Sequence, residues 1–128
     1  MSSVVALTTD TFEDHVKREG IALIDFWAEW CAPCRAFAPV FEAAADKHAD
    51  AAFGKLDVDA EPALAGALGI RSIPMLMIFR DGYLVFAQPG MLPAAALDTL
   101  LDKVRDLDME EVKRVTDEAV EQARRGEA

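Results

Sequence analysis

Positive charge is scarce in this chain of 128 residues, which has 13 lysines and arginines against 23 aspartates and glutamates. The formal net charge is −10 at pH 7, and the sequence pI is about 4.5. Nucleic acid and anionic lipid surfaces attract basic faces, because their phosphate groups must be neutralised at the contact. The composition therefore argues against binding to nucleic acid or to an anionic membrane surface.

Long apolar runs and cysteines are also few. No stretch approaches the roughly 20 apolar residues that a membrane span needs. The segment Met1–Thr8 lacks both the basic start and the apolar length of a secretory signal. Two cysteines are too few for a secreted scaffold held together by disulfides. We therefore expect a soluble, cytoplasmic protein with no membrane attachment, and its 52% of hydrophobic residues can fill the core of one domain.

Strand-like and helix-like segments alternate along the chain. Apolar runs predict strands at residues 4–7, 21–27, 52–58, 75–79 and 83–86. Helical spacing predicts helices over about 10–20, 31–48, 59–69 and 94–107, the second of them with Pro39 inside it. The order β-α-β-α-β-α-β-β-α indicates an α/β fold with a mixed sheet and helices on both faces.

Polar residues and turn formers set the expected ends of these elements. We expect Asp10 to cap the first helix with Glu13 in a capping box, and Gly20 to end it. Asp59 is expected to cap the short third helix, which has Pro62 in its first turn. Asp-Gly at 81–82 predicts a tight hairpin turn.

A last segment extends beyond this domain. Asp108 and Glu111 form a second candidate capping box, so a helix is expected from Met109 to about Arg125. One side of that helix carries a thin apolar stripe of Met109, Val112, Val115, Ala119 and Ala123. We therefore divide the chain into a domain at 1–107 and a C-terminal helical extension at 108–128.

The motif Trp30-Cys31-Ala32-Pro33-Cys34 lies where the buried strand 21–27 leads into a helix. Two intervening residues bring both sulfurs within disulfide reach across one helical turn. Cys31 falls at the helix N-terminus, where free N–H groups and the macrodipole favour a thiolate, the reactive form of cysteine. The alternatives are structural zinc and two idle core cysteines. Zinc needs four ligands, and neither His15 nor His48 lies at ligand spacing from the pair. The spacing therefore favours redox chemistry.

The sequence closely resembles the thioredoxin family over about residues 4–107. The stretch that matches best is 24–35, and further matches lie at 38–39, 55–59, 69–74, 79–82 and 90. The resemblance implies a thioredoxin fold, with a central mixed five-stranded sheet. Ala32, Ser72 and Met75 depart from the residues most common in the family, and Ala32 leaves the reduction potential open because residues between the cysteines tune it.

The resemblance also implies roles for the residues around the motif. Cys31 would be the nucleophile and Cys34 the resolving cysteine of a redox disulfide. Asp25 would be buried behind Cys34 and relay its proton, with Lys55 as the partner of Asp25. The alternatives are that Asp25 marks a strand end facing water and that Lys55 is an ordinary solvated lysine.

A substrate-binding surface is implied next to the cysteines. The resemblance makes the Ile73–Pro74 bond cis, with the Ile73 backbone free to pair with an extended client chain. A plain proline at a strand entry is the alternative. The surface is expected to comprise Trp30, Ala32, Pro33, Ile73, Pro74 and Gly90, together with Met75 and Met91, whereas Trp27 is assigned to the core.

These features predict a dithiol–disulfide oxidoreductase that reduces protein disulfides and needs no bound cofactor. The implied partners are disulfide-containing client proteins and a flavoprotein thioredoxin reductase that uses NADPH. Two other hypotheses remain open. One is an interaction module whose C-terminal helix docks to a partner or drives dimerisation, with redox turnover secondary. The other is an oxidant rather than a reductant, which the reduction potential would decide.

Overall fold

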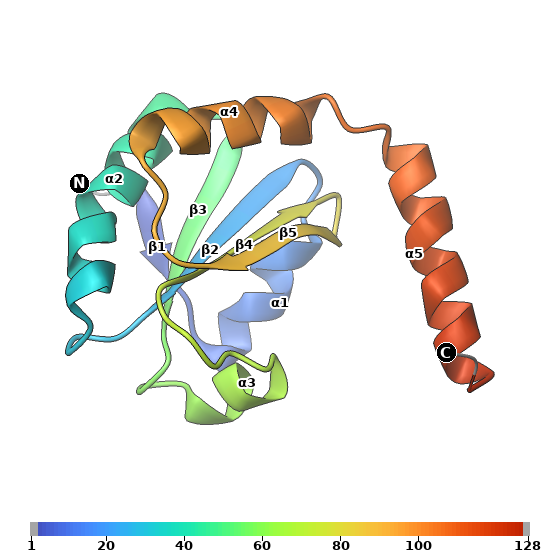
Figure 1. Ribbon diagram of the computed structural model, residues 1–128, viewed down its shortest axis with the longest axis horizontal. Coiled ribbons are helices and arrows are strands. Elements are labelled where there is room, and N and C mark those ends of the chain that lie inside the picture. Colours follow the sequence, from blue (N-terminus) through green and yellow to red (C-terminus); the bar gives the residue numbers. More distant parts are fainter. Residues whose placement is uncertain (1–2, 127–128) are drawn as a thin grey trace.

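A five-stranded sheet forms the centre of the molecule, for which a computed structural model describes residues 3–126 (Figure 1). The strands lie in the order β1-β3-β2-β4-β5. Their bounds are β1 Val4–Ala6, β2 Ile21–Trp27, β3 Ala51–Asp57, β4 Met75–Arg80 and β5 Tyr83–Pro89. Strands β1, β3 and β2 run parallel, whereas β4 is antiparallel to β2 and β5 is antiparallel to β4. The predicted mixed five-stranded sheet is confirmed.

Strand β2 is the central strand, and the continuous apolar run predicted it residue for residue. Six of its seven residues are buried, which is typical of a strand covered on both faces. Its register places Asp25 opposite Lys55 of β3 on one side and Leu76 of β4 on the other. The one charged residue of the strand is thereby fixed in the middle of the sheet.

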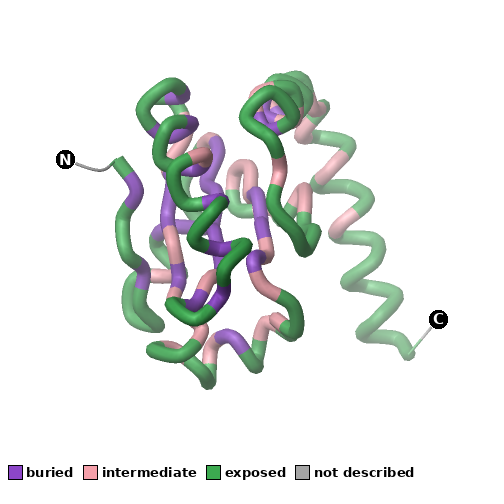
Figure 2. Tube along the Cα trace, turned by 60° about the vertical axis from the view of Figure 1, so that its left-hand side comes forward, coloured by how far each residue is buried: buried purple, intermediate pink, exposed green. Residues whose placement is uncertain are grey.

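Helices cover both faces of the sheet, as predicted. On one face α2 (Ala32–Lys47) and α4 (Ala94–Arg105) bury a cluster that includes Phe37, Phe41 and Leu97. On the other face α1 (Thr9–Lys17) and α3 (Pro62–Ala67) cover a smaller cluster around Phe26 and Leu56. Figure 2 shows the buried positions concentrated in the strands and on the inner sides of the helices. Residues 28–31 lead from the end of β2 to the start of α2.

Two predicted helix caps are wrong. Helix α1 begins after Thr8 rather than Asp10, because the Thr8 N–H donates to Thr11 Oγ1 at 2.9 Å and completes the cap two residues earlier. Helix α3 is capped at Glu61 rather than Asp59. The hairpin prediction is confirmed, with Asp81 at φ +53° and Gly82 at φ +85° between β4 and β5.

Helix α5 (Met109–Arg124) begins as predicted. Its N-cap residue is Asp108, whose side chain accepts hydrogen bonds from the Glu110 and Glu111 N–H groups. Its connection to α4 is held by Arg80, whose Nη1 donates to the carbonyls of Val104, Arg105 and Leu107. Figure 1 shows α5 extending away from the sheet, on the far side of the molecule from the start of α2. None of its residues is buried. Over residues 3–126, no helix is long and apolar enough to cross a membrane.

Candidate active site

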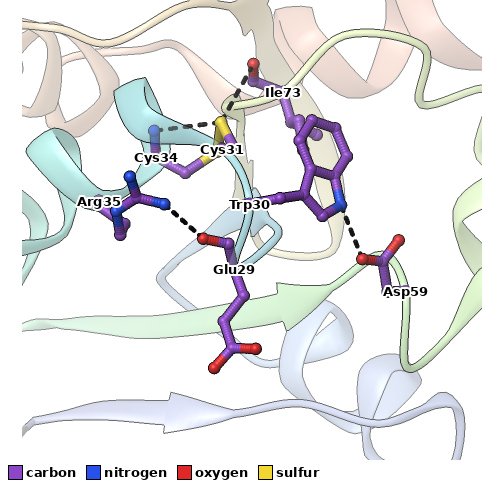
Figure 3. Close-up of a disulfide and its surroundings, with 7 residues drawn as sticks. All are labelled: Glu29, Trp30, Cys31, Cys34, Arg35, Asp59 and Ile73. Atoms are coloured by element: carbon purple, nitrogen blue, oxygen red, sulfur yellow. Dashed lines mark hydrogen bonds between the residues drawn. A yellow bond between two sulfur atoms is a disulfide. The ribbon is translucent and has the colours of Figure 1, made fainter.

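Cys31 and Cys34 are joined by a disulfide at the N-terminus of α2 (Figure 3). Their Cα atoms lie 5.2 Å apart, within the usual range for a disulfide. Cys31 is the N-cap residue, and its Sγ accepts a hydrogen bond from the Cys34 N–H at 3.2 Å. Both residues are buried, and Cys34, at 2% exposed, is less exposed than Cys31 at 5%, as predicted.

The start of α2 suits a negatively charged sulfur. The first N–H groups of a helix have no partner within the helix, and the macrodipole adds positive potential there. Pro33 occupies the first turn, where its missing N–H removes no helical hydrogen bond. Arg35 Nη1 donates to the Glu29 carbonyl at 2.6 Å and ties this turn to the loop after β2. In the reduced protein the Cys31 thiolate would accept a hydrogen bond from the same Cys34 N–H group.

Asp25 is buried, with 4% of its surface exposed, so the alternative that it marks a strand end facing water is wrong. Burial raises the pKa of Asp25 to about 7, because desolvation disfavours the carboxylate, while the Lys55 charge opposes the shift. Within residues 3–126, Asp25 Oδ1 has no hydrogen-bond partner. A carboxyl group with this pKa can take up or release a proton near neutrality.

A small cavity of about 100 Å³ lies between Asp25 and Cys34. Its walls are formed by Asp25, Trp27, Cys34, Arg35, Ala38 and Lys55. Lys55 is half-buried rather than freely solvated, and its Nζ lies 5.4 Å from the centre of the Trp27 ring. The structure thus brings Asp25, Cys34 and Lys55 together around one space, as the resemblance implies.

The Ile73–Pro74 bond is cis and faces the disulfide. The Ile73 carbonyl oxygen lies 3.8 Å from Cys31 Sγ (Figure 3). On the other side of this loop the Gly90 N–H donates to the Pro74 carbonyl at 2.7 Å. Gly90 has φ +100°, a conformation that favours glycine. The backbone around Ile73 is therefore held beside Cys31 Sγ.

An apolar rim surrounds Cys31. Trp30 is 68% exposed, and Met91, Ala32, Pro33 and Gly90 are exposed as well. Ile73 and Met75 are half-buried. Trp27 is also half-buried, and it lines the cavity beside Asp25 rather than the rim. Pro74 is buried, so among the residues expected to receive client chains it offers no exposed surface.

Asp59 makes a contact with the rim that the sequence analysis did not predict. Its Oδ2 accepts a hydrogen bond from Trp30 Nε1 at 2.8 Å, which fixes the orientation of the exposed indole (Figure 3). The sequence suggested a helix cap instead, because aspartate before a proline-containing turn is typical of one. Asp57 orders that turn, since its Oδ1 accepts from the Asp59 and Ala60 N–H groups. The match of residues 55–59 to the family was the signal that marked this segment.

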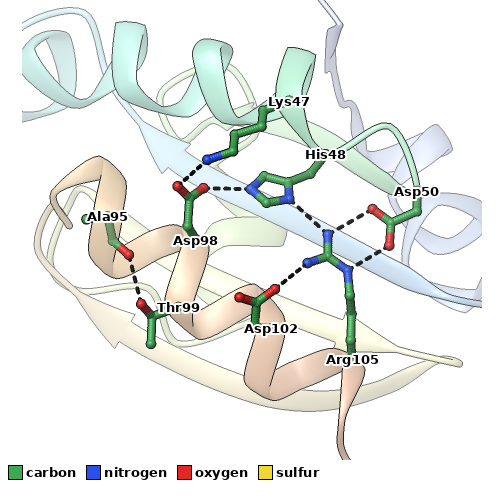
Figure 4. Close-up of polar contacts among 8 residues, drawn as sticks. All are labelled: Lys47, His48, Asp50, Ala95, Asp98, Thr99, Asp102 and Arg105. Carbon is green, nitrogen blue, oxygen red and sulfur yellow. Dashed lines mark hydrogen bonds and ion pairs between the residues drawn. The ribbon is translucent and has the colours of Figure 1, made fainter.

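Neither histidine shares a site with the cysteines. His15 Nε2 lies 3.1 Å from the Leu23 carbonyl. His48 connects α2 to α4, with Nε2 at 2.6 Å from Asp98 Oδ1 and Nδ1 at 2.9 Å from Arg105 Nη2 (Figure 4). In the part of the chain that the structure describes, no three His, Cys, Asp or Glu side chains are grouped to hold a metal ion.

Comparison with known proteins identifies one family in both the family model and the similar sequences. The family model described as Thioredoxin matches residues 3–103. A Streptomyces coelicolor protein that carries the name thioredoxin 2 is 51% identical over 123 residues, which are 96% of this chain and 92% of that protein. Thioredoxin 1 of Synechococcus elongatus is 44% identical over 105 residues, covering 80% of this chain and 98% of its own length.

Solved structures agree with the sequence comparison. A mutant thioredoxin from Halobacterium salinarum superposes with a TM-score of 0.75 at 35% identity, covering 81% of this chain and 92% of that one. The thioredoxin of Malassezia sympodialis gives a TM-score of 0.71 at 30% identity, covering 80% and 91%. The Streptomyces alignment is long enough to include most of α5, whereas the family model ends inside α4.

Proposed function

The chain belongs to the thioredoxin family and is a protein-disulfide reductase, and from this premise we propose how its residues divide the work. The observation that supports the proposal best is the position of the Cys31–Cys34 pair, with Cys31 at the start of α2 and Cys34 beside the cavity of Asp25. One sulfur faces the client, and the other faces a buried proton acceptor. Each cysteine therefore has a different task.

Cys31 attacks first. Its thiolate forms a bond to one sulfur of the client disulfide, and the other client sulfur leaves as a thiolate that takes up a proton. The product is a mixed disulfide between Cys31 and the client. The helix N-terminus and the Cys34 N–H support this assignment, because both stabilise a negative charge on Cys31 Sγ.

Cys34 completes the exchange. Asp25 accepts the proton of the Cys34 thiol through the cavity, and the resulting thiolate attacks Cys31 Sγ. The mixed disulfide breaks, the second client thiol is released, and the Cys31–Cys34 disulfide remains. Two electrons have passed from this protein to the client. Lys55 favours the ionised form of Asp25, so it acts as a positioning residue for the carboxylate.

The client chain is held by the rim and by the backbone beside Cys31. An extended segment can pair with the main chain at Ile73, as in strand addition at a sheet edge. Trp30, Ala32, Pro33 and Gly90 supply the surrounding contact surface, whereas Pro74 is buried and contributes through its cis bond to Ile73. Because these groups recognise mainly backbone and apolar surface, we expect several clients rather than one.

A partner must return the disulfide to the dithiol. We assign this step to a flavoprotein thioredoxin reductase that takes its electrons from NADPH, and we place the cycle in the cytoplasm, where thiols are kept reduced. No bound cofactor is needed on this chain, because the two sulfurs carry both electrons.

Insulin reduction tests the proposal. With NADPH and a thioredoxin reductase present, the protein should accelerate the reduction of insulin disulfides, with one NADPH consumed for each disulfide. Its reduction potential should lie near the roughly −270 mV of thioredoxins. A potential near about −120 mV would make it an oxidant. Absence of turnover in a folded, reducible protein would favour the interaction module.

A further inference from the structure

Helix α5 has an apolar side that its own domain covers only in part. The stripe contains Met109, Val112, Val115, Thr116, Ala119, Val120 and Ala123, spaced to share one side of a helix. Val112 and Thr116 are half-buried against β5, whereas Val115 is 50% exposed and Val120 48% exposed. Ala119 and Ala123 are exposed too. The second half of the stripe therefore lies open.

A groove separates the first half of α5 from the sheet. It has a volume of about 300 Å³ and is lined by Leu84, Val85, Leu107, Val112, Val115 and Thr116, with Glu111 at one side. Leu84, on the edge strand β5, is itself 48% exposed. The chain thus presents an unfilled apolar groove and, one to two helical turns further along the same helix, an uncovered apolar ridge of small side chains.

The ridge matches the groove of a second copy. If two α5 helices pair antiparallel, centred between Asp117 and Glu118, the groove-lining residues Val112, Val115 and Thr116 each face a ridge residue of the other copy. The residues that face each other across the two helices are Val112 and Ala123, Val115 and Val120, and Thr116 and Ala119. Because each pair consists of small side chains, the two helix axes can approach closely. We propose that two copies of this chain form a symmetric dimer in which each α5 fills the groove of the other.

The charges of α5 agree with this arrangement. Residues 110–118 hold four acidic side chains and two basic ones, Lys113 and Arg114, of which Arg114 pairs with Glu111 and Glu118, whereas Arg124 and Arg125 end the helix. Antiparallel pairing sets the arginines level with Glu111 and Glu110 of the other copy, and it also opposes the two helix dipoles. The four cations of segment 109–125 nearly balance its five anions, although the whole chain carries −10. Two copies meeting at α5 therefore avoid most of their mutual repulsion.

The dimer leaves the redox site free. Helix α5 lies on the far side of the molecule from the start of α2, so neither Cys31 nor the rim around it is covered (Figure 1). A two-fold arrangement also buries the same patch on both copies, as symmetric dimers do. Dimerisation would thus present two independent disulfide sites, one at each outer end.

Sedimentation velocity of the full chain across a wide concentration range tests the proposal, with the Cys31–Cys34 pair kept oxidised to prevent intermolecular disulfides. We expect a concentration-dependent shift from 14.0 kDa to twice that mass. Ala119→Glu places an unpaired charge at the centre of the contact and should raise the dissociation constant at least about tenfold. Ala43→Glu, the same change on the exposed side of α2, is the matched control and should leave dimerisation unchanged.

Insulin reduction by both variants should equal that of the parent chain, because neither position contacts the redox site. A chain that stays monomeric up to millimolar concentration would overturn the proposal. So would a dimer that Ala119→Glu weakens no more than Ala43→Glu does.

Discussion

The redox site and helix α5 are built in opposite ways. At the redox site the side chains to which we assign the chemistry are buried, and burial raises the pKa of Asp25 to about 7. Helix α5 has no buried residue and makes its contacts at the surface. Reactivity at the redox site thus depends on burial from solvent, whereas association through α5 depends on apolar surface that stays exposed. Changes at one region should therefore leave the function of the other intact.

The largest effect should come from Cys31→Ser. Because only Cys31 is placed at the helix N-terminus and near the client surface, the variant should lose insulin reduction and rapid alkylation at neutral pH. Mass spectrometry after brief iodoacetamide treatment and an insulin assay would measure both losses. Circular dichroism should show an unchanged fold. Rapid alkylation of the remaining Cys34 would reverse the assignment of the two sulfurs.

Asp25→Asn should slow the resolving step at least about tenfold at or below pH 7, because Cys34 loses its proton acceptor. Above pH 7 more of Cys34 ionises unaided, so the difference should shrink as the pH rises. Stopped-flow rates of mixed-disulfide resolution across pH would show this trend. A loss that is independent of pH, or no loss, would make Asp25 purely structural. Asp106→Asn, which changes an exposed aspartate, is the control.

The same substitution should stabilise the fold at high pH. A carboxyl whose pKa rises from 3.8 to about 7 on folding binds its proton more tightly in the native state. The native protein therefore loses stability as the pH rises from about 4 to 7, and the deficit is constant above that range. Asparagine has no charge to desolvate. Asp25→Asn should therefore raise the free energy of unfolding by up to about 4 kcal/mol above pH 7 and leave it unchanged below pH 4. Urea unfolding at several pH values would measure it, and an equal gain at every pH would contradict the account.

Deleting residues 108–128 should have the smallest effect on chemistry. The remaining 1–107 keeps the sheet, both core clusters and every residue of the redox site. We expect unchanged insulin reduction, a melting temperature lower by a few degrees, and loss of self-association. Melting curves and sedimentation of the two chains would show this. Failure of the shortened chain to fold would prove that the domain boundary at 107 is wrong.

Local sequence patterns predicted the strand and the helix that carry the redox site, whereas the places of Asp25, Lys55 and the cis bond at Pro74 were implied by the family resemblance. The bounds of β2 and the position of Cys31 at the start of α2 are confirmed, because a continuous apolar run and a CxxC motif each depend on neighbouring residues alone. Helix caps were harder to place. Thr8 and Asp10 are both good N-cap residues, and the bond between Thr8 and Thr11 decides between them.

Contacts between residues far apart in the sequence could not be predicted from local patterns. Asp59 bonds to Trp30 across 29 residues, and a helix-cap position would have the same sequence signature. The stripe of α5 illustrates the same limit. Its periodicity predicts a helix, but the same spacing would suit a helix packed along its whole length or one that docks only by its first turns.

The measurement that tests the central claim most directly is trapping with Cys34→Ser. If Cys31 is the attacking sulfur and Cys34 the resolving one, this variant should form a stable mixed disulfide with a disulfide-containing peptide. Mass spectrometry of the digested product should then place the peptide on Cys31, and Cys31→Ser should trap none. A variant that turns over without accumulating the mixed disulfide, or a peptide found on Cys34 of the Cys31→Ser chain, would contradict the account.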